Sequence, residues 1–138
     1  MSKVLRIPYS TIGGNPQTLM PRFSLILNNE QNSLEVTGLV DSGSVLNVIL
    51  FTVGQNLGFI WEHQTVPIHL GGVYSGIEAR GVFVSASHTI LTENQPIDMV
   101  FAWANSDKVS LVFGRTNFFQ AFDVCFFGID EYFEITRR

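Results

Sequence analysis

The stretch Leu39-Val40-Asp41-Ser42-Gly43 sets the interpretation of the whole chain. Its two apolar residues predict the end of a buried strand, which delivers one carboxylate into a Ser-Gly turn. A carboxylate directly after buried residues is costly to remove from water, so it needs hydrogen-bond donors close by. The Ser42 hydroxyl and the Gly43 backbone can supply them. Asp41 is therefore the first candidate for a functional residue.

The composition limits the classes of protein that fit. The chain has 138 residues, enough for one domain with its own core, and 46% of them are hydrophobic, with 12 Phe. The formal net charge of -4 comes without basic clusters, which argues against a nucleic-acid partner. We expect the single cysteine, Cys125, to be a small buried hydrophobic residue rather than a reactive thiol.

Targeting and metal-binding signals are weak in this sequence. It has neither the apolar core of a signal peptide nor a stretch that could span a bilayer, so we expect a cytoplasmic protein without a membrane partner. His63, His69 and His88 lack the short spacing of metal ligands. We therefore expect neither a metal nor another cofactor.

Alternating apolar residues predict a protein made mostly of short strands. Residues 4–9 fit an edge strand or a flexible arm, and we assign residues 1–20 to this arm and 21–138 to the domain. A hairpin is expected around residues 23–27 and 34–40, and its second strand leads into Asp41. Further strands are expected at residues 45–50, 97–103, 109–113, 124–127 and 132–135.

A long hairpin is predicted between residues 66 and 86, with Gly71-Gly72-Val73-Tyr74-Ser75-Gly76 at its tip. Adjacent glycines accept positive φ and leave little packing at the tip, so a mobile flap and an ordinary turn both fit. Two short helices are also expected. One covers residues 52–57, with Thr52 and Gln55 as a capping box and Gly58 as its stop, and the other follows Thr116 or Asn117 and carries Phe118, Phe119 and Phe122.

The chain also carries an echo of its first stretch. Leu111-Val112-Phe113-Gly114 is again an apolar strand that ends at a glycine. With Ser44, the glycine-rich hairpin tip, and Arg115 before a Phe-containing helix, these features resemble the retroviral-type (retropepsin-like) aspartic proteases. The resemblance is closest to short single-domain cyanobacterial members, and it covers roughly residues 21–135. It implies a mostly β, single-domain acid-protease fold, closed like an orthogonal β-barrel with one or two short helices, and active as a homodimer.

The resemblance also implies roles for individual residues. It makes Asp41 catalytic, with Ser42 linking two active-site loops and Gly43 leaving room for the substrate backbone. The flap tip and nearby apolar residues would bind an extended peptide or protein substrate, namely Gly71, Gly72, Val73, Tyr74, Ser75, Ile77 and Phe113. Structural support of the site would come from Ser44, Leu111, Val112, Gly114 and Arg115.

Two positions depart from the family's pattern. Phe113 is bulkier than the aliphatic residue that usually precedes the late glycine, so the packing under the site must adjust. Val45 stands where many viral members carry an aspartate that pairs with the late arginine. Arg115 therefore needs another partner.

The chemistry of this route requires two carboxyl groups, one that takes a proton from water and one that assists the carbonyl oxygen. No other aspartate of the chain has the Ser/Thr-Gly context, so two Asp41 side chains across a homodimer axis are expected. Two like charges in contact do not both ionise easily, so such a pair shares one proton. The expected function is an aspartic endopeptidase that cleaves extended, apolar-flanked peptides. The rival interpretation is a dimeric peptide-binding module of the same fold that does not cleave.

Overall fold

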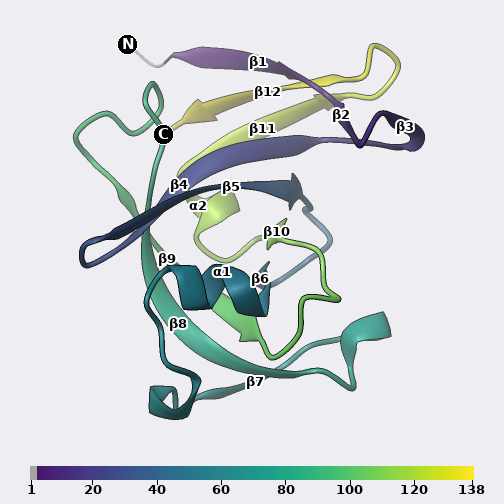
Figure 1. Cartoon of the computed structure of the whole chain (residues 1–138). Helices are drawn as coiled ribbons and strands as arrows, with labels where there is room; N and C mark the ends of the chain where they lie inside the picture. Colours follow the sequence, from purple (N-terminus) through teal and green to yellow (C-terminus); the bar gives the residue numbers. More distant parts are fainter. Residues whose placement is uncertain (1–2) are drawn as a thin grey trace.

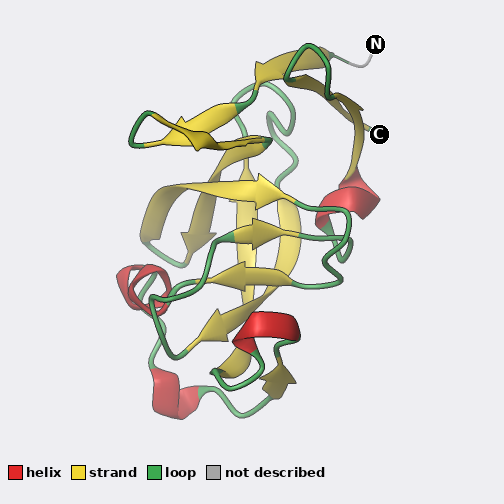
Figure 2. Ribbon diagram, turned by 90° about the vertical axis from the view of Figure 1, so that its right-hand side faces the viewer, coloured by secondary structure: helices red, strands yellow, loops and turns green. Residues whose placement is uncertain are grey.

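Strands dominate the structure, a computed structural model that describes residues 3–138. The strands are β1 (Val4–Pro8), β2 (Ser10–Ile12), β3 (Asn15–Met20), β4 (Arg22–Asn29), β5 (Asn32–Val40), β6 (Asn47–Ile49), β7 (Pro67–His69), β8 (Glu78–Ser87), β9 (Ile97–Ala104), β10 (Val112–Phe113), β11 (Phe122–Phe127) and β12 (Tyr132–Arg137). The helical segments are α1 (Phe51–Asn56), α2 (Phe118–Ala121) and the 3-10 turns η1 (Trp61–His63) and η2 (Gly72–Tyr74). In Figure 2 these helical segments lie around the strands.

Six strands close into a barrel, which confirms the predicted fold class. They pair in the order β4-β5-β10-β6-β9-β8, and β8 pairs again with β4 to close the ring. The long predicted hairpin is present as β7 and β8, with η2 at its tip, and it extends from the barrel at the lower end of Figure 1. Because the barrel is closed, its central strands have no free edge.

The core is filled by the inward-facing residues of alternating strands and by the phenylalanines. Phe23, Leu25 and Leu27 on β4 are buried, whereas the residues between them are half-buried. The Phe23 ring meets the rings of Phe118 and Phe122 edge-on, each at 6.3 Å between centroids. The core thus joins β4 to α2 and to the strand that follows it.

The two ends of the chain form a separate three-stranded sheet at the other end of the molecule (Figure 1). β12 lies in its middle, between β1 and β11, and five residues of β1 pair with β12 from Val4↔Thr136 to Pro8↔Tyr132. Residues 4–8 are therefore an edge strand. They pair with the C-terminal strand of the same chain.

The expectation that Cys125 is buried was wrong. β11 alternates its residues between two faces, and Phe122 and Val124 face the core. Cys125 is the next residue after Val124, so it lies on the opposite face and is exposed. The strand period of two, rather than the apolar character of the segment, decides its position.

The predicted cap of α1 was also wrong. The helix begins one residue earlier than expected, and its N-cap is Leu50, without a side-chain hydrogen bond. The carboxylate of Asp107 instead accepts hydrogen bonds from the backbone N–H of Thr52 at 2.9 Å and from the Thr52 hydroxyl at 3.2 Å. Gly58 does end the helix region with a φ of +87°.

A hairpin that the sequence analysis did not expect, β2–β3, follows the edge strand. Its two strands are joined by Gly13 and Gly14, with φ of +58° and +75°. Two adjacent residues with positive φ are typical of a tight hairpin turn, so this Gly-Gly pair was a usable signal. Among the helices of residues 3–138, none is long and apolar enough to cross a membrane.

Candidate active site

Asp41 lies where β5 leaves the barrel, beside the strand that echoes it. β5 and β10 pair in parallel, with Leu39 opposite Val112 and Val40 opposite Phe113. The backbone N–H of Asp41 donates to the Phe113 carbonyl at 3.0 Å and so continues the ladder by one bond. The two apolar stretches are therefore paired side by side, and this pairing fixes the backbone that carries the candidate carboxylate.

A tight loop then turns the chain away from the sheet. The Gly43 N–H donates to the Asp41 Oδ1 at 2.9 Å, and the Ser44 N–H donates to the Asp41 carbonyl at 3.2 Å. Asp41 is half-buried, whereas Ser42 and Gly43 are exposed. The Gly43 backbone N–H therefore supplies the local donor that the sequence predicted. Within the described residues, the Ser42 hydroxyl does not donate a hydrogen bond to the Asp41 carboxylate.

Gly114 fits a space that admits no side chain. A Cβ atom there would lie 2.6 Å from the Ser44 carbonyl oxygen and closer still to that of Leu46. The Arg115 N–H donates to the same Ser44 oxygen at 2.8 Å, and the Ser44 hydroxyl donates to the Leu46 carbonyl at 2.7 Å. The loop that carries Asp41 thus rests directly on the segment after β10.

Asn47 is a supporting residue that the sequence analysis missed. Its side chain is buried, its Oδ1 accepts from the Gly114 N–H at 2.7 Å, and its Nδ2 donates to the carbonyls of Val100 and Thr116, each at 2.9 Å. One amide therefore joins β6, β9 and the segment after β10. An Asn six residues after Asp41 carries no local signal, because its partners lie 53 to 69 residues away.

Phe113 is a core residue and does not line a substrate pocket, contrary to the expectation. It has no exposed surface, and its ring stacks on that of Phe118 at 5.0 Å with an interplanar angle of 8°. Gly38, opposite this ring, leaves space for it, since a Cβ there would lie 2.8 Å from Phe113 Cε2. The barrel accommodates the bulky side chain in this way.

The flap tip and the barrel wall share a second apolar cluster. Val48 and Val112 lie in it with Ala79 of β8, and Leu39, Tyr74 and Ile77 pack against its edge. It contains three of the residues that the sequence assigned to substrate binding or support, namely Val112 of the wall and Tyr74 and Ile77 of the flap. Leu111, also assigned to support, packs instead against the edge of the main core.

The flap tip itself is a 3-10 turn that begins at Gly72, whose φ is +61°. Gly71 and Ser75 are exposed, and Val73 has 92% of its surface exposed. The Tyr74 hydroxyl accepts from the Ser110 N–H at 3.1 Å and lies 3.4 Å from the Ser110 hydroxyl. Tyr74 thus connects the tip to the loop that precedes β10.

Arg115 contributes its backbone to the site, and its side chain is exposed. The four ion pairs found in residues 3–138 do not include it. Val45, which replaces the expected acidic partner, has 54% of its surface exposed. The partner predicted for Arg115 is therefore not found within the described chain.

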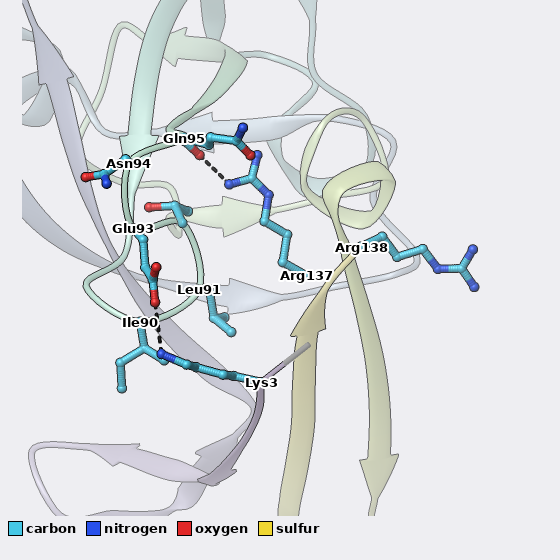
Figure 3. A pocket seen from close by; sticks show the side chains of 9 residues that line it. Lys3, Ile90, Leu91, Glu93, Asn94, Gln95, Arg137 and Arg138 are labelled. Carbon is cyan, nitrogen blue, oxygen red and sulfur yellow. Dashed lines mark hydrogen bonds and ion pairs between the residues drawn. The ribbon is translucent and has the colours of Figure 1, made fainter. Parts of the chain in front are cut away.

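A polar pocket of about 610 Å³ lies away from these segments, between residues 90–95 and the chain ends (Figure 3). Lys3 is paired there with Glu93 at 2.9 Å, Arg137 donates to the Gln95 carbonyl, and Arg138 turns away to Asp123. Its cationic side chains are therefore already engaged. In residues 3–138, no group of three His, Cys, Asp or Glu side chains could hold a metal ion.

Comparisons with known proteins agree with this architecture. A scan against protein-family models and a search of curated proteins each found no match. Among solved structures, the chain is similar to a retropepsin-like aspartic protease from Rickettsia conorii, with a TM-score of 0.66 and 12% identity over 99% of this chain and 94% of that one. It is also similar to EIAV protease complexed with the inhibitor HBY-793, with a TM-score of 0.50 and 16% identity over 77% of this chain and 88% of that one. The chain therefore has the retropepsin-like fold.

Proposed function

We propose that the protein is an aspartic endopeptidase that uses a pair of Asp41 carboxyl groups, one from each of two identical subunits. The observation that carries the proposal is the setting of Asp41. Its carboxylate stands at the end of a barrel strand, in an exposed loop held by Gly43, Ser44 and Gly114. A fixed and accessible carboxylate on a retropepsin-like fold suits acid–base chemistry.

A second subunit is needed because one chain supplies one such group. Asp98, Asp107, Asp123 and Asp130 are exposed on other segments, and Asp107 and Asp123 are engaged in hydrogen bonds there. A two-fold axis beside Asp41 would bring two equivalent carboxyl groups together. The pair would then share one proton, and either member could act as acid or base.

In this mechanism the ionised Asp41 takes a proton from a water molecule, whose oxygen attacks the carbonyl carbon of the peptide bond. The protonated Asp41 of the second copy gives its proton to the carbonyl oxygen, and a tetrahedral diol forms. The diol collapses when the C–N bond breaks: the nitrogen takes the proton now held by the first Asp41, and the ionised Asp41 of the second copy takes a proton from one diol hydroxyl. The products are a carboxylic acid and an amine, and the pair again holds one proton.

An extended peptide suits the geometry around Asp41. Its backbone would pair with strand-like segments, and the flap tip would close over it. Tyr74 and Ile77 on the flap face Val48 and Val112 on the barrel wall, so apolar side chains beside the cleaved bond are favoured. Gly71 to Ser75 would supply the backbone that contacts the peptide.

The test is cleavage of an unstructured peptide library by the purified protein between mildly acidic and neutral pH. Asp41→Asn should abolish cleavage while its circular dichroism spectrum and unfolding midpoint stay those of the wild type. Asp98→Asn, which makes the same substitution at an exposed aspartate on β9, is the control and should cleave normally. Equal cleavage by the Asp41→Asn variant would overturn the assignment.

The peptide-binding module without turnover is the outcome if the wild type binds extended peptides and cleaves none. Val45 and the unpaired position of Arg115 leave room for that outcome. Phe113 no longer does, because the core accommodates its ring.

A further inference from the structure

A groove of about 500 Å³ runs between the β2–β3 hairpin and the barrel wall. Eight of the eleven residues that line it are apolar. Ile12 and Met20 come from the hairpin, Leu39 from β5, Leu50 from the start of α1 and Leu111 from the segment just before β10. Ile12 and Met20 have 62% and 43% of their surfaces exposed. Figure 1 shows the hairpin projecting from the barrel on the side where β5 ends. An open apolar surface of this kind indicates a binding site.

The three polar residues of the groove are already engaged with other groups. Arg22 donates through Nη1 to the carbonyls of Ser10 and Thr18, and the Thr37 hydroxyl lies 2.7 Å from that of Ser24. Ser110 is bound to the Tyr74 hydroxyl. The groove therefore presents few free polar groups, and an occupant with an uncharged, apolar side chain fits it best.

The hairpin is internally fixed although it is exposed. The Thr18 hydroxyl accepts from the Ile12 N–H at 2.7 Å and donates to the Asn15 carbonyl at 2.6 Å. Arg22 ties the base of the hairpin to β4. Its apolar side chains are thus held in place over the groove, as a wall that determines specificity must be.

The groove is continuous with the proposed active site at three points. Leu39 lies two residues before Asp41, the Leu39 N–H donates to the Leu111 carbonyl at 2.9 Å, and Ser110 is the residue bound to the flap tip. A peptide that extends from Asp41 past the flap would therefore enter this groove. No separate partner is required to explain its apolar lining.

We propose that this groove binds an apolar side chain of the substrate peptide, and that Ile12 and Met20 of the β2–β3 hairpin determine the preference. The inference rests on the proposed function, and it adds a residue preference that the fold alone does not imply. The hairpin acts on specificity, whereas Asp41 acts on the bond itself. Changes in the hairpin should therefore alter which peptides are cut and leave the chemistry intact.

The test compares cleavage of one peptide library by the wild type, Ile12→Glu and Met20→Glu. A carboxylate in the apolar wall should reduce the enrichment of apolar residues at one position of the cleaved peptides by about tenfold and leave the other positions unchanged. Ile129→Glu is the matched control, because Ile129 is 98% exposed on the β11–β12 turn. An unchanged cleavage profile in both hairpin variants would overturn the inference.

A second measurement separates this inference from the proposed function. Asp41→Asn protein with ¹³C-labelled Ile and Met methyl groups is titrated with Ac-Gly-Ser-Leu-Phe-Ser-Gly-amide and with Ac-Gly-Ser-Asn-Gln-Ser-Gly-amide. The Ile12 and Met20 methyl signals should shift with the first peptide and not with the second, while the Ile129 signal stays fixed. If these shifts are seen but the wild-type protein cleaves no peptide, the proposed protease function is refuted and the proposed peptide-binding groove is retained.

The same spectra detect the competing occupant. If the Ile12 and Met20 methyl signals stay fixed with both peptides and shift only when the concentration of the protein alone is raised, a second copy of the chain fills the groove. That result would overturn the inference. Signals that respond neither to peptide nor to protein concentration would overturn it as well.

Discussion

Asn47 is the residue on which the support of the Asp41 loop most depends. Asn47→Leu keeps the volume but leaves the Gly114 N–H and the carbonyls of Val100 and Thr116 without their partner. Buried groups that lose a hydrogen bond cost about 1–3 kcal/mol each, so the free energy of unfolding should fall by about 3 kcal/mol or more. Urea unfolding measures this loss. Asn56→Leu on the exposed end of α1 is the control, and an equal, small change in both variants would contradict the role of Asn47.

His88 should make stability depend on pH. Burial lowers the pKa of its imidazole from the ordinary value of 6.5, its ring stacks on Phe23, and its Nδ1 accepts from the N–H groups of Ile90 and Leu91 at 3.1 and 3.2 Å. The unfolded chain therefore takes up the proton at a higher pH than the folded chain. The stability that the neutral His88 contributes to the folded chain is fully present above the pKa of this imidazole in the unfolded chain. It is lost as the pH falls below that pKa.

The measurement is the free energy of unfolding at pH values between about 7.5 and about 5.5. In this range carboxylates with ordinary pKa values stay ionised. The wild type should lose stability toward the acidic end. His88→Asn retains a short acceptor for the same backbone N–H groups but does not titrate, so its stability should depend less on pH. A wild-type slope that persists unchanged in His88→Asn would show that other groups are responsible.

The residues of the site were predictable only where the signal is local. Asp41, Gly43 and Gly114 follow from an apolar strand that ends in a turn, and each has the role of holding or carrying that turn. Asn47 was missed because its three partners are distant in sequence. Phe113 was assigned to the wrong surface, because composition does not tell which face of a two-residue strand turns inward.

At the scale of elements, the cap of α1 is the clearest case in which tertiary structure replaces a local motif. Thr52 and Gln55 have the spacing of a capping box, but the helix begins at Phe51 and its first turn is bound by the loop before β10. Asp107→Ala should lower the unfolding free energy by about 1 kcal/mol, as the loss of a capping side chain does. Asp107→Asn retains the accepting oxygen and should recover most of the loss, as measured by thermal unfolding. A Thr52→Val loss larger than that of Asp107→Ala would instead favour Thr52 as the cap.

The predictability of elements followed their hydrophobic pattern. The β4–β5 and β7–β8 hairpins were predicted because apolar residues alternate on both sides of a polar or glycine-rich turn. β2–β3 was missed because its residues are mostly exposed and show no such alternation. A glycine inside a helix is ordinarily unfavourable, but Gly54 is required in α1, since a Cβ there would lie 2.7 Å from Trp103 Cδ1.

At the scale of the whole molecule, the closure of the barrel depends on pairings between distant segments. β4 pairs with β8 across about sixty residues, and β5 pairs with β10 across more than seventy. No local pattern specifies such pairs, so the family resemblance carried the prediction of the barrel. The terminal sheet is the other large-scale feature, and it places β1 and β12 of one chain side by side. A second subunit therefore need not supply a terminal strand for this sheet to form.

If two Asp41 carboxyl groups make one site, a dimer of one wild-type and one Asp41→Asn subunit should be inactive. At a fixed amount of wild type, an equal amount of Asp41→Asn should reduce cleavage to about half, because subunits that exchange freely leave half of the wild-type chains in mixed dimers. Adding the same amount of Asp98→Asn should instead raise cleavage, since its subunits retain Asp41. Sedimentation velocity at the assay concentration should find a dimer in both mixtures and in the wild type alone. If the cleavage rate does not change when Asp41→Asn protein is added, each chain carries a complete site. The proposal of a shared Asp41 pair would then fail even if the protein is a protease.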